Sequence, residues 1–167
     1  EKVAKILEEF EGVNSYSSSN ALVKQIIEMG DDAVEPLLAM LPKDDNHSPY
    51  GWAKRMAIED SLNGLLNEDH KDIILQAFKT NDGLAKCLAK YKFPEGEDLV
   101  MDKLKTGSNK PFSCISPDVV NLALAYNEER AVPLLVKALD KGGPNTAHIA
   151  LKLATYPELD IDDELIN

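Results

Sequence analysis

Apolar residues recur along most of the chain at the spacing of an amphipathic helix. Near the N-terminus, Val3, Ile6, Leu7 and Phe10 follow the i, i+3, i+4, i+7 pattern of one helical stripe, and Gly12 ends that segment. The same period continues almost to the C-terminus. Val, Ile and Thr never alternate with polar residues over the length of a strand. We therefore expect an all-α protein of roughly ten helices joined by short polar turns.

Residues that begin and end helices interrupt this pattern at regular intervals. Asp31 and Asp32 begin a helix with Pro36 in its first turn, and Pro42 ends it. Residues 116–118 read Ser-Pro-Asp, which combines an N-cap, a proline at the first helical position and an acid in the first turn. Polar loops are expected at residues 43–50 and 107–111.

Two segments share one pattern of residue types. Residues 30–41 read Gly-Asp-Asp-Ala-Val-Glu-Pro-Leu-Leu-Ala-Met-Leu, and residues 127–139 read Asn-Glu-Glu-Arg-Ala-Val-Pro-Leu-Leu-Val-Lys-Ala-Leu. Acidic helix starts near Asp69 and Glu97 lie between them, which gives about three periods of roughly 32 residues. A compact helical bundle is the alternative, and the repeated pattern favours a solenoid of helical pairs.

The segment Gly30–Leu41 resembles the second helix of HEAT-like repeats, and Ala21–Met29 would be the first helix of that pair. Arg55 and Leu62 also stand at a spacing typical of such repeats. The resemblance covers about half of the chain and is weakest between Asn81 and Pro111. It implies one α-solenoid domain over residues 1–167, with four to five antiparallel helical pairs.

In a HEAT-like solenoid, the second helices form a ladder that lines one extended surface for proteins or peptides. The apolar stripes place Val34, Leu37, Leu38, Ile73, Ile74, Leu99, Leu134 and Leu135 inwards, so Leu38 and Leu135 are expected to be core positions. The outward positions define the predicted partner-binding residues, together with Trp52 from the loop before a long helix: Glu35, Trp52, Asp72, Gln76, Asp98, Asp102 and Glu129.

Net charge restricts the partners of this surface. The formal charge is -11, so a nucleic acid would be repelled, and Arg55 and Arg130 are the only arginines available to read phosphates or bases. An acidic face attracts basic segments, so we expect a basic protein or peptide as the partner. Two alternatives remain at this point: the acids form only a solvated face, and Trp52 only begins its helix and fills a gap between repeats.

Candidate catalytic chemistry is sparse. None of His47, His70 and His148 belongs to a metal-binding motif, Cys87 and Cys114 form no CxxC pair, and nucleotide-binding motifs are missing from the sequence. We expect no cofactor and no metal, exposed or capping histidines, and two thiols that are not bonded to each other. A helical-repeat enzyme of lyase-like type, with a small-molecule site that the sequence does not locate, is the alternative function.

The compartment follows only weakly from the sequence. No apolar run is long enough to span a membrane. We expect a cytoplasmic location, with export as the alternative because the chain begins at Glu1 and a leader could have been removed.

Overall fold

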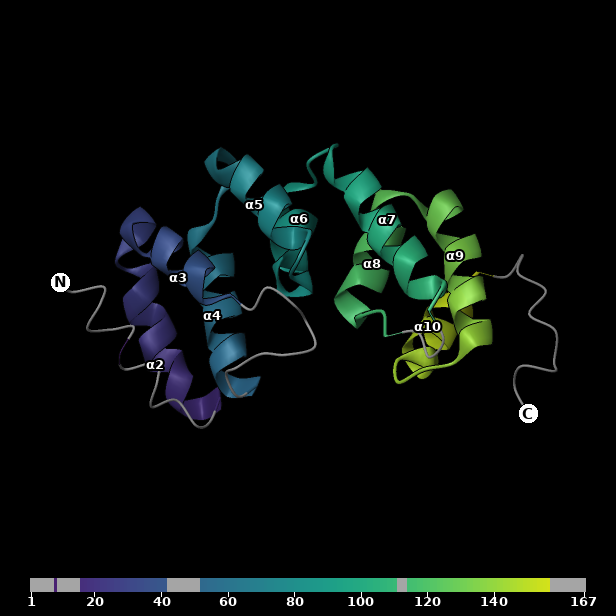
Figure 1. The fold of residues 1–167 in the computed structure, drawn as a ribbon, viewed down its shortest axis with the longest axis horizontal. Coiled ribbons are helices and arrows are strands. Elements are labelled where there is room, and N and C mark those ends of the chain that lie inside the picture. The colour runs from purple at the N-terminus through teal and green to yellow at the C-terminus, as the bar shows by residue number, and fades with distance from the viewer. Residues whose placement is uncertain (1–7, 9–15, 42–51, 111–113, 157–167) are drawn as a thin grey trace. The chain divides into compact units, whose positions relative to one another are not determined.

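The structure, a computed structural model, describes residues 8, 16–41, 52–110 and 114–156. These residues form nine α-helices and three short 3₁₀ helices and contain no strand (Figure 1), which confirms the prediction of an all-α protein. The chain divides into two compact units, Glu1–Phe93 and Pro94–Asn167. The single domain over residues 1–167 stays a prediction. The stripe from Val3 to Phe10 and the loop at 43–50 lie outside the described residues.

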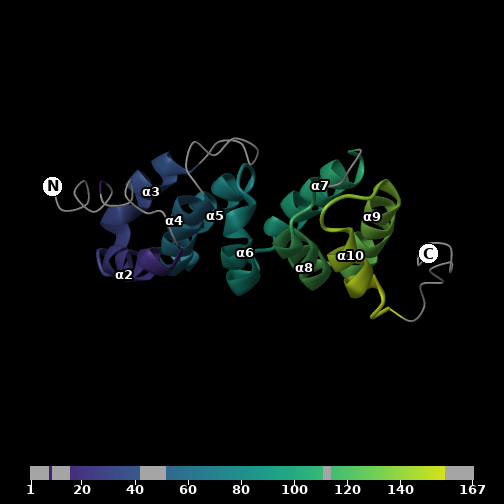
Figure 2. The ribbon, with the colours of Figure 1, turned by 90° about the horizontal axis from the view of Figure 1, so that it is seen from below.

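Unit 1 contains five α-helices in its described part. They are α2 (Tyr16–Ile27), α3 (Val34–Met40), α4 (Trp52–Leu65), α5 (Lys71–Phe78) and α6 (Ala85–Tyr91), with the 3₁₀ helices η1 (Gly30–Ala33), η2 (Glu68–His70) and η3 (Asp82–Leu84) before α3, α5 and α6. Helix α2 lies along α4, and α3 also packs on α4 (Figures 1 and 2). Because η3 contacts α4, α5 and α6, it joins the last two helices to the rest of the unit.

Unit 2 contains four α-helices in its described part. They are α7 (Gly96–Ser108), α8 (Pro117–Tyr126), α9 (Glu128–Lys141) and α10 (Thr146–Leu153). Helix α7 packs on α8 and α9, and α10 closes the unit against α8 and α9. The hydroxyl of Ser116 accepts a hydrogen bond from the Val119 backbone N–H, as the N-cap pattern predicts. The loop prediction for 107–111 began too early, because α7 continues through Ser108.

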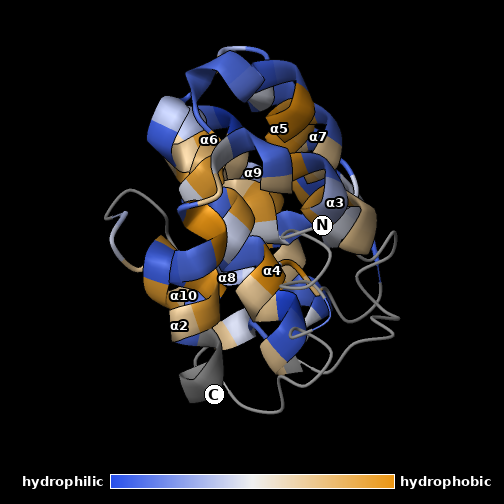
Figure 3. Ribbon diagram, turned by 90° about the vertical axis from the view of Figure 1, so that its left-hand side faces the viewer, coloured by the Kyte–Doolittle hydropathy of each residue, from blue (hydrophilic) through white to orange (hydrophobic). Residues whose placement is uncertain are grey.

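The core of each unit consists of one stripe per helix, and hydrophobic and hydrophilic residues occupy different sides of helices such as α4 and α5 (Figure 3). In each pair of adjacent leucines or isoleucines predicted to point inwards, only one residue is fully buried. Val34, Leu37, Ile74 and Leu135 are buried as expected, whereas Leu38, Leu99 and Leu134 are half-buried and Ile73 is exposed. The prediction that all eight point inwards, and that Leu38 is a core position, was therefore wrong.

The two repeated Leu-Leu pairs differ in which leucine is buried: it is the first in α3 and the second in α9. The reason is the helix start. A four-residue 3₁₀ helix precedes α3, whereas α9 begins directly after its Asn127 N-cap. Each 3₁₀ residue turns the chain about 120° rather than about 100°, so η1 adds about 80°, nearly one residue. Leu37 consequently takes the direction that Leu135 has in α9.

Candidate functional site

A groove of about 490 Å³ lies between α3 and α5 in unit 1. Its apolar floor comes from Leu38 and Leu41 at the C-terminal end of α3 and from Ile73 and Ala77 on α5. Ile73 is 37% exposed, which is unusual for an isoleucine in a helix that also contributes to the core. This volume lies within the range of roughly 300–1,000 Å³ found for ligand sites.

One edge of the groove is polar. Asp72 and Gln76 are one helical turn apart on α5, Thr80 lies in the turn after the helix, and all three line the groove beside the apolar floor. The Gln76 side-chain oxygen accepts a hydrogen bond of 3.0 Å from Lys79, and the Thr80 hydroxyl donates to the Ala77 carbonyl. Among the described residues, the Asp72 carboxylate has no hydrogen-bond or ion-pair partner. The Asp72 carboxylate can therefore pair with a positively charged group of a bound molecule.

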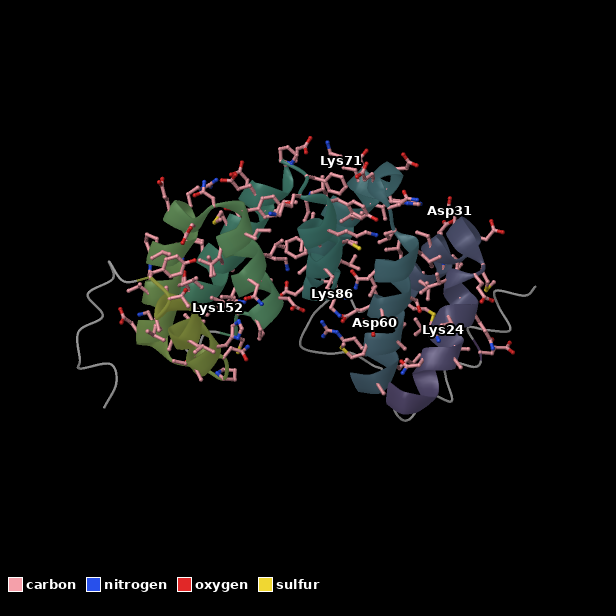
Figure 4. All side chains as sticks on the ribbon, turned by 180° about the vertical axis from the view of Figure 1, so that it is seen from behind. Lys24, Asp31, Asp60, Lys71, Lys86 and Lys152 are labelled. Atoms are coloured by element: carbon pink, nitrogen blue, oxygen red, sulfur yellow. The ribbon has the colours of Figure 1, made fainter. Side chains whose placement is uncertain are left out.

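The two helices that form the groove are tied together at their N-terminal ends. His70 Nε2, at the end of η2, lies 3.7 Å from a carboxylate oxygen of Asp31 in η1. The other ring nitrogen of His70 is 2.9 Å from Asn67 Oδ1 and 3.3 Å from the Asn67 backbone nitrogen, so His70 completes the capping box of η2. Asp31 and Lys71 lie at this same end of unit 1 (Figure 4).

Unit 2 has a corresponding contact between helix starts, which a charged arginine makes. Asn127 caps α9, and Arg130, three residues later, reaches back to the first turn of α7. Its guanidinium donates to Glu97 at 2.6 Å and to Asp98 at 3.0 Å, and the Asn127 amide donates to the same Glu97 carboxylate. Because one guanidinium nitrogen donates to two carboxylates, this contact fixes the two helices more firmly than the single His70 contact does.

The sequence contains a signal for these ties that residue periodicity alone does not reveal. Asn67–His70 and Asn127–Arg130 both read Asn, two acids and a basic side chain. In each case the Asn side chain caps the helix, and the basic residue at the third position bridges to an acid at the start of an earlier helix. His70 is thus a capping residue, as predicted. The same prediction is wrong for His148, which is half-buried on α10 and whose Nε2 is buried with no hydrogen-bond partner among the described residues.

The structure brings two of the predicted partner-binding residues into the groove. Asp72 and Gln76 line it, and Glu35 is exposed on α3 but is not one of its lining residues. Trp52 begins α4, and its side chain lies outside the described part. In unit 2, Asp102 and Glu129 are exposed, and Asp98 is engaged by Arg130. Leu38, Leu41, Ile73, Ala77 and Thr80 were not predicted as binding residues.

A second polar cluster lies inside unit 1 around α4. The Glu59 carboxylate is buried and accepts a 2.7 Å hydrogen bond from Arg55 Nε, the arginine noted in the HEAT-like pattern. The Asn63 amide donates to the carbonyls of Glu59 and Gly83, and the Gly83 N–H donates to Asn81 Oδ1 at 2.7 Å. Near it, Lys86 from α6 pairs with Asp60 from α4 at 3.3 Å (Figure 4).

This buried cluster is structural. The Cys87 thiol donates to Asn63 Oδ1 at 3.1 Å, and burial raises the pKa of Cys87 to about 11, so the thiol stays protonated at neutral pH and is a poor nucleophile. The Asn81 side-chain nitrogen is buried and has no hydrogen-bond partner in the described part of the chain. Within the described residues, no group of three or more His, Cys, Asp and Glu side chains could hold a metal ion.

Gly83→Ala is expected to lower the free energy of unfolding by about 1–3 kcal/mol. A Cβ at this position would overlap the Glu59 carboxylate, which Arg55 holds in place, while hydrogen bonds to Asn63 and Asn81 fix the Gly83 backbone. Urea denaturation followed by circular dichroism measures the effect.

Gly64→Ala is the matched control for this cluster. A Cβ at Gly64 would meet the end of the Ile27 side chain, which is partly exposed and can rotate away, and alanine favours the helix. Gly64→Ala should leave stability nearly unchanged. Equal losses for the two variants would show that the Glu59 carboxylate can also move aside.

The remaining ionisable groups and comparisons with known proteins give no further evidence on the function of the groove. In unit 2, burial raises the pKa of Tyr126 to about 12, with further contributions from Glu95 and Glu97. Among the described residues, no helix is long and apolar enough to cross a membrane. Comparison of the chain with protein-family models, curated proteins and solved structures finds no match. The geometry of the groove is therefore the main indication of function.

Proposed function

We propose that this protein is a binding scaffold in which the α3–α5 groove of unit 1 holds a segment of another protein. The observation that carries the proposal is an open groove with an apolar floor, an exposed Ile73 and a row of polar groups along one edge. Binding sites for peptides combine these features, because apolar anchors supply affinity and a polar edge fixes orientation.

The same proposal includes a HEAT-like arrangement of the helices. In it, α2 and α3 form one pair, α4 and α5 the next, and α8 and α9 a third, so α3, α5 and α9 are second helices. The acid-rich helix starts, the His70 contact between the starts of α3 and α5, and the packing of α8 on α9 support this pairing. A groove between successive second helices is the place where such a scaffold binds its partner.

Catalysis receives less support from the same geometry. General acid–base chemistry needs ionisable groups that converge on one substrate. Of the eight residues that line the groove, Asp72 is the only ionisable one. The lyase-like alternative therefore has no specific observation in its favour.

Ile73→Glu and Leu38→Glu should each weaken peptide binding by about 10-fold or more, because each places a charge on one wall of the apolar floor. A library of short random peptides is selected on the unmodified protein, and affinities of the enriched peptides are then measured by fluorescence anisotropy. Ile73 is exposed and Leu38 half-buried, so both variants are expected to stay folded, which thermal melts verify.

Leu151→Glu is the matched control for this test. Leu151 is 69% exposed on α10 of unit 2 and is not one of the residues that line the groove. The control should leave the affinity of the selected peptides unchanged. The proposal is wrong if no peptide is enriched, or if the control weakens binding as much as the two groove variants do.

A further inference from the structure

The groove differs between its two ends in charge. Residues 30–41 and 68–80, which form its two sides, contain six acids and two lysines, a formal net charge of -4 with His70 neutral. All six acids lie in the helix starts: Asp31, Asp32, Glu35, Glu68, Asp69 and Asp72. The C-terminal end of the two helices has no acid and contributes Leu38, Leu41, Lys79 and Thr80.

Helix dipoles do not cancel the acidic end. Acids in a first turn are favourable for the helix itself, and each helix N-terminus contributes about half of a positive charge. Two such termini supply about one positive charge against the six acids and Lys71 of this end, which have a formal net charge of -5. The acidic end therefore keeps a negative potential, and Asp72 places part of that charge at the edge of the apolar floor.

The negative potential at one end of the groove favours some binding partners over others. A nucleic acid would bring a dense negative charge to an acidic site and would be repelled. A second copy of this chain, at -11, would also meet repulsion of like charge at this face. A basic segment of another protein gains attraction from the same charges and can place an apolar side chain on the floor.

We propose, building on the binding function above, that the occupant is a short basic protein segment with one apolar anchor side chain. The anchor lies on the floor formed by Leu38, Ile73 and Ala77. A lysine or arginine next to the anchor points towards the acidic end and pairs with Asp72. The apolar anchor supplies most of the affinity, and the Asp72 pair sets orientation and raises the association rate.

The test uses synthetic labelled peptides with a Leu-Phe anchor and two flanking charges. One set has lysines on the N-terminal side of the anchor, a second has them on the C-terminal side, and matched sets replace the lysines by glutamates. Binding is measured by fluorescence anisotropy at low and high salt. One of the two lysine peptides should bind better than its glutamate counterpart, and added salt should reduce the difference.

Charge exchange at Asp72 then tests the direct contact. Asp72→Lys should weaken the lysine peptide about two- to five-fold, as expected for an exposed pair, and should strengthen the glutamate peptide. Asp118→Lys is the matched control, because Asp118 is an exposed acid in the first turn of α8 in unit 2. The control should leave the preference for lysine peptides unchanged.

The outcomes separate this inference from the proposed function. If Ile73→Glu abolishes binding while Asp72→Lys and Asp118→Lys behave alike, the groove binds peptides but the basic partner is wrong. If Ile73→Glu has no effect on any bound peptide, the groove function itself is wrong. A dimer in sedimentation experiments that Ile73→Glu dissociates would overturn the inference in favour of a second copy of the chain.

Discussion

Leu37→Asp is expected to unfold unit 1, whereas Leu38→Asp should leave it folded. The Leu37 side chain is fully buried, so the substitution removes core packing and places an unpaired charge in the interior. Together these effects cost about 4 kcal/mol or more, a large part of the stability of an ordinary domain. The Leu38 side chain faces the groove, where a carboxylate keeps its water, and the expected loss is about 1 kcal/mol.

Far-UV circular dichroism during thermal and urea unfolding measures both variants against the unmodified protein. Leu38→Asp also serves as the control for charge, because it introduces the same carboxylate one residue away. Similar losses at the two positions would contradict the assignment of Leu37 to the core and Leu38 to the groove.

In α9 the order of the two leucines should be reversed. Leu135→Asp is expected to unfold unit 2 at a cost of about 4 kcal/mol or more, because Leu135 is fully buried. Leu134 is half-buried, so Leu134→Asp should cost about 1 kcal/mol.

The two pairs of variants together test the helix-start explanation. The same Pro-Leu-Leu sequence occurs in both segments, yet the sensitive leucine should be the first one after Pro36 and the second one after Pro133. Equal sensitivity at equivalent positions, Leu38 with Leu135 or Leu37 with Leu134, would show that the 3₁₀ turn of η1 does not rotate α3 as described.

These expectations also show how the groove arises. Leu38 on α3 is half-buried and Ile73 on α5 is exposed, and both line the space between α3 and α5. Helix α9 begins without a 3₁₀ turn, and Arg130 ties its start to α7 through two carboxylates. In unit 1, the His70–Asp31 contact of 3.7 Å joins η2 and η1, and an apolar groove lies between α3 and α5.

The sequence by itself determined the all-α class, most helix positions and the N-cap at Ser116. These features depend on residues that are close together in the sequence. They are the recurrence of apolar residues about every 3.6 positions, the N-cap at Ser116, and glycine or proline at helix ends. Asp72 and Gln76 were also identified from the sequence, because the polar side of an amphipathic helix follows from the same period.

Tertiary structure alone decided which member of each apolar pair is buried and where the groove lies. A periodic stripe defines a direction only to within about one residue, and three or four residues of 3₁₀ helix are enough to change it. The sequence had assigned Leu38 and Ile73 to the core for this reason. The division into two units and the engagement of Asp98 by Arg130 likewise depend on contacts between residues that are distant in the sequence, which no local pattern specifies.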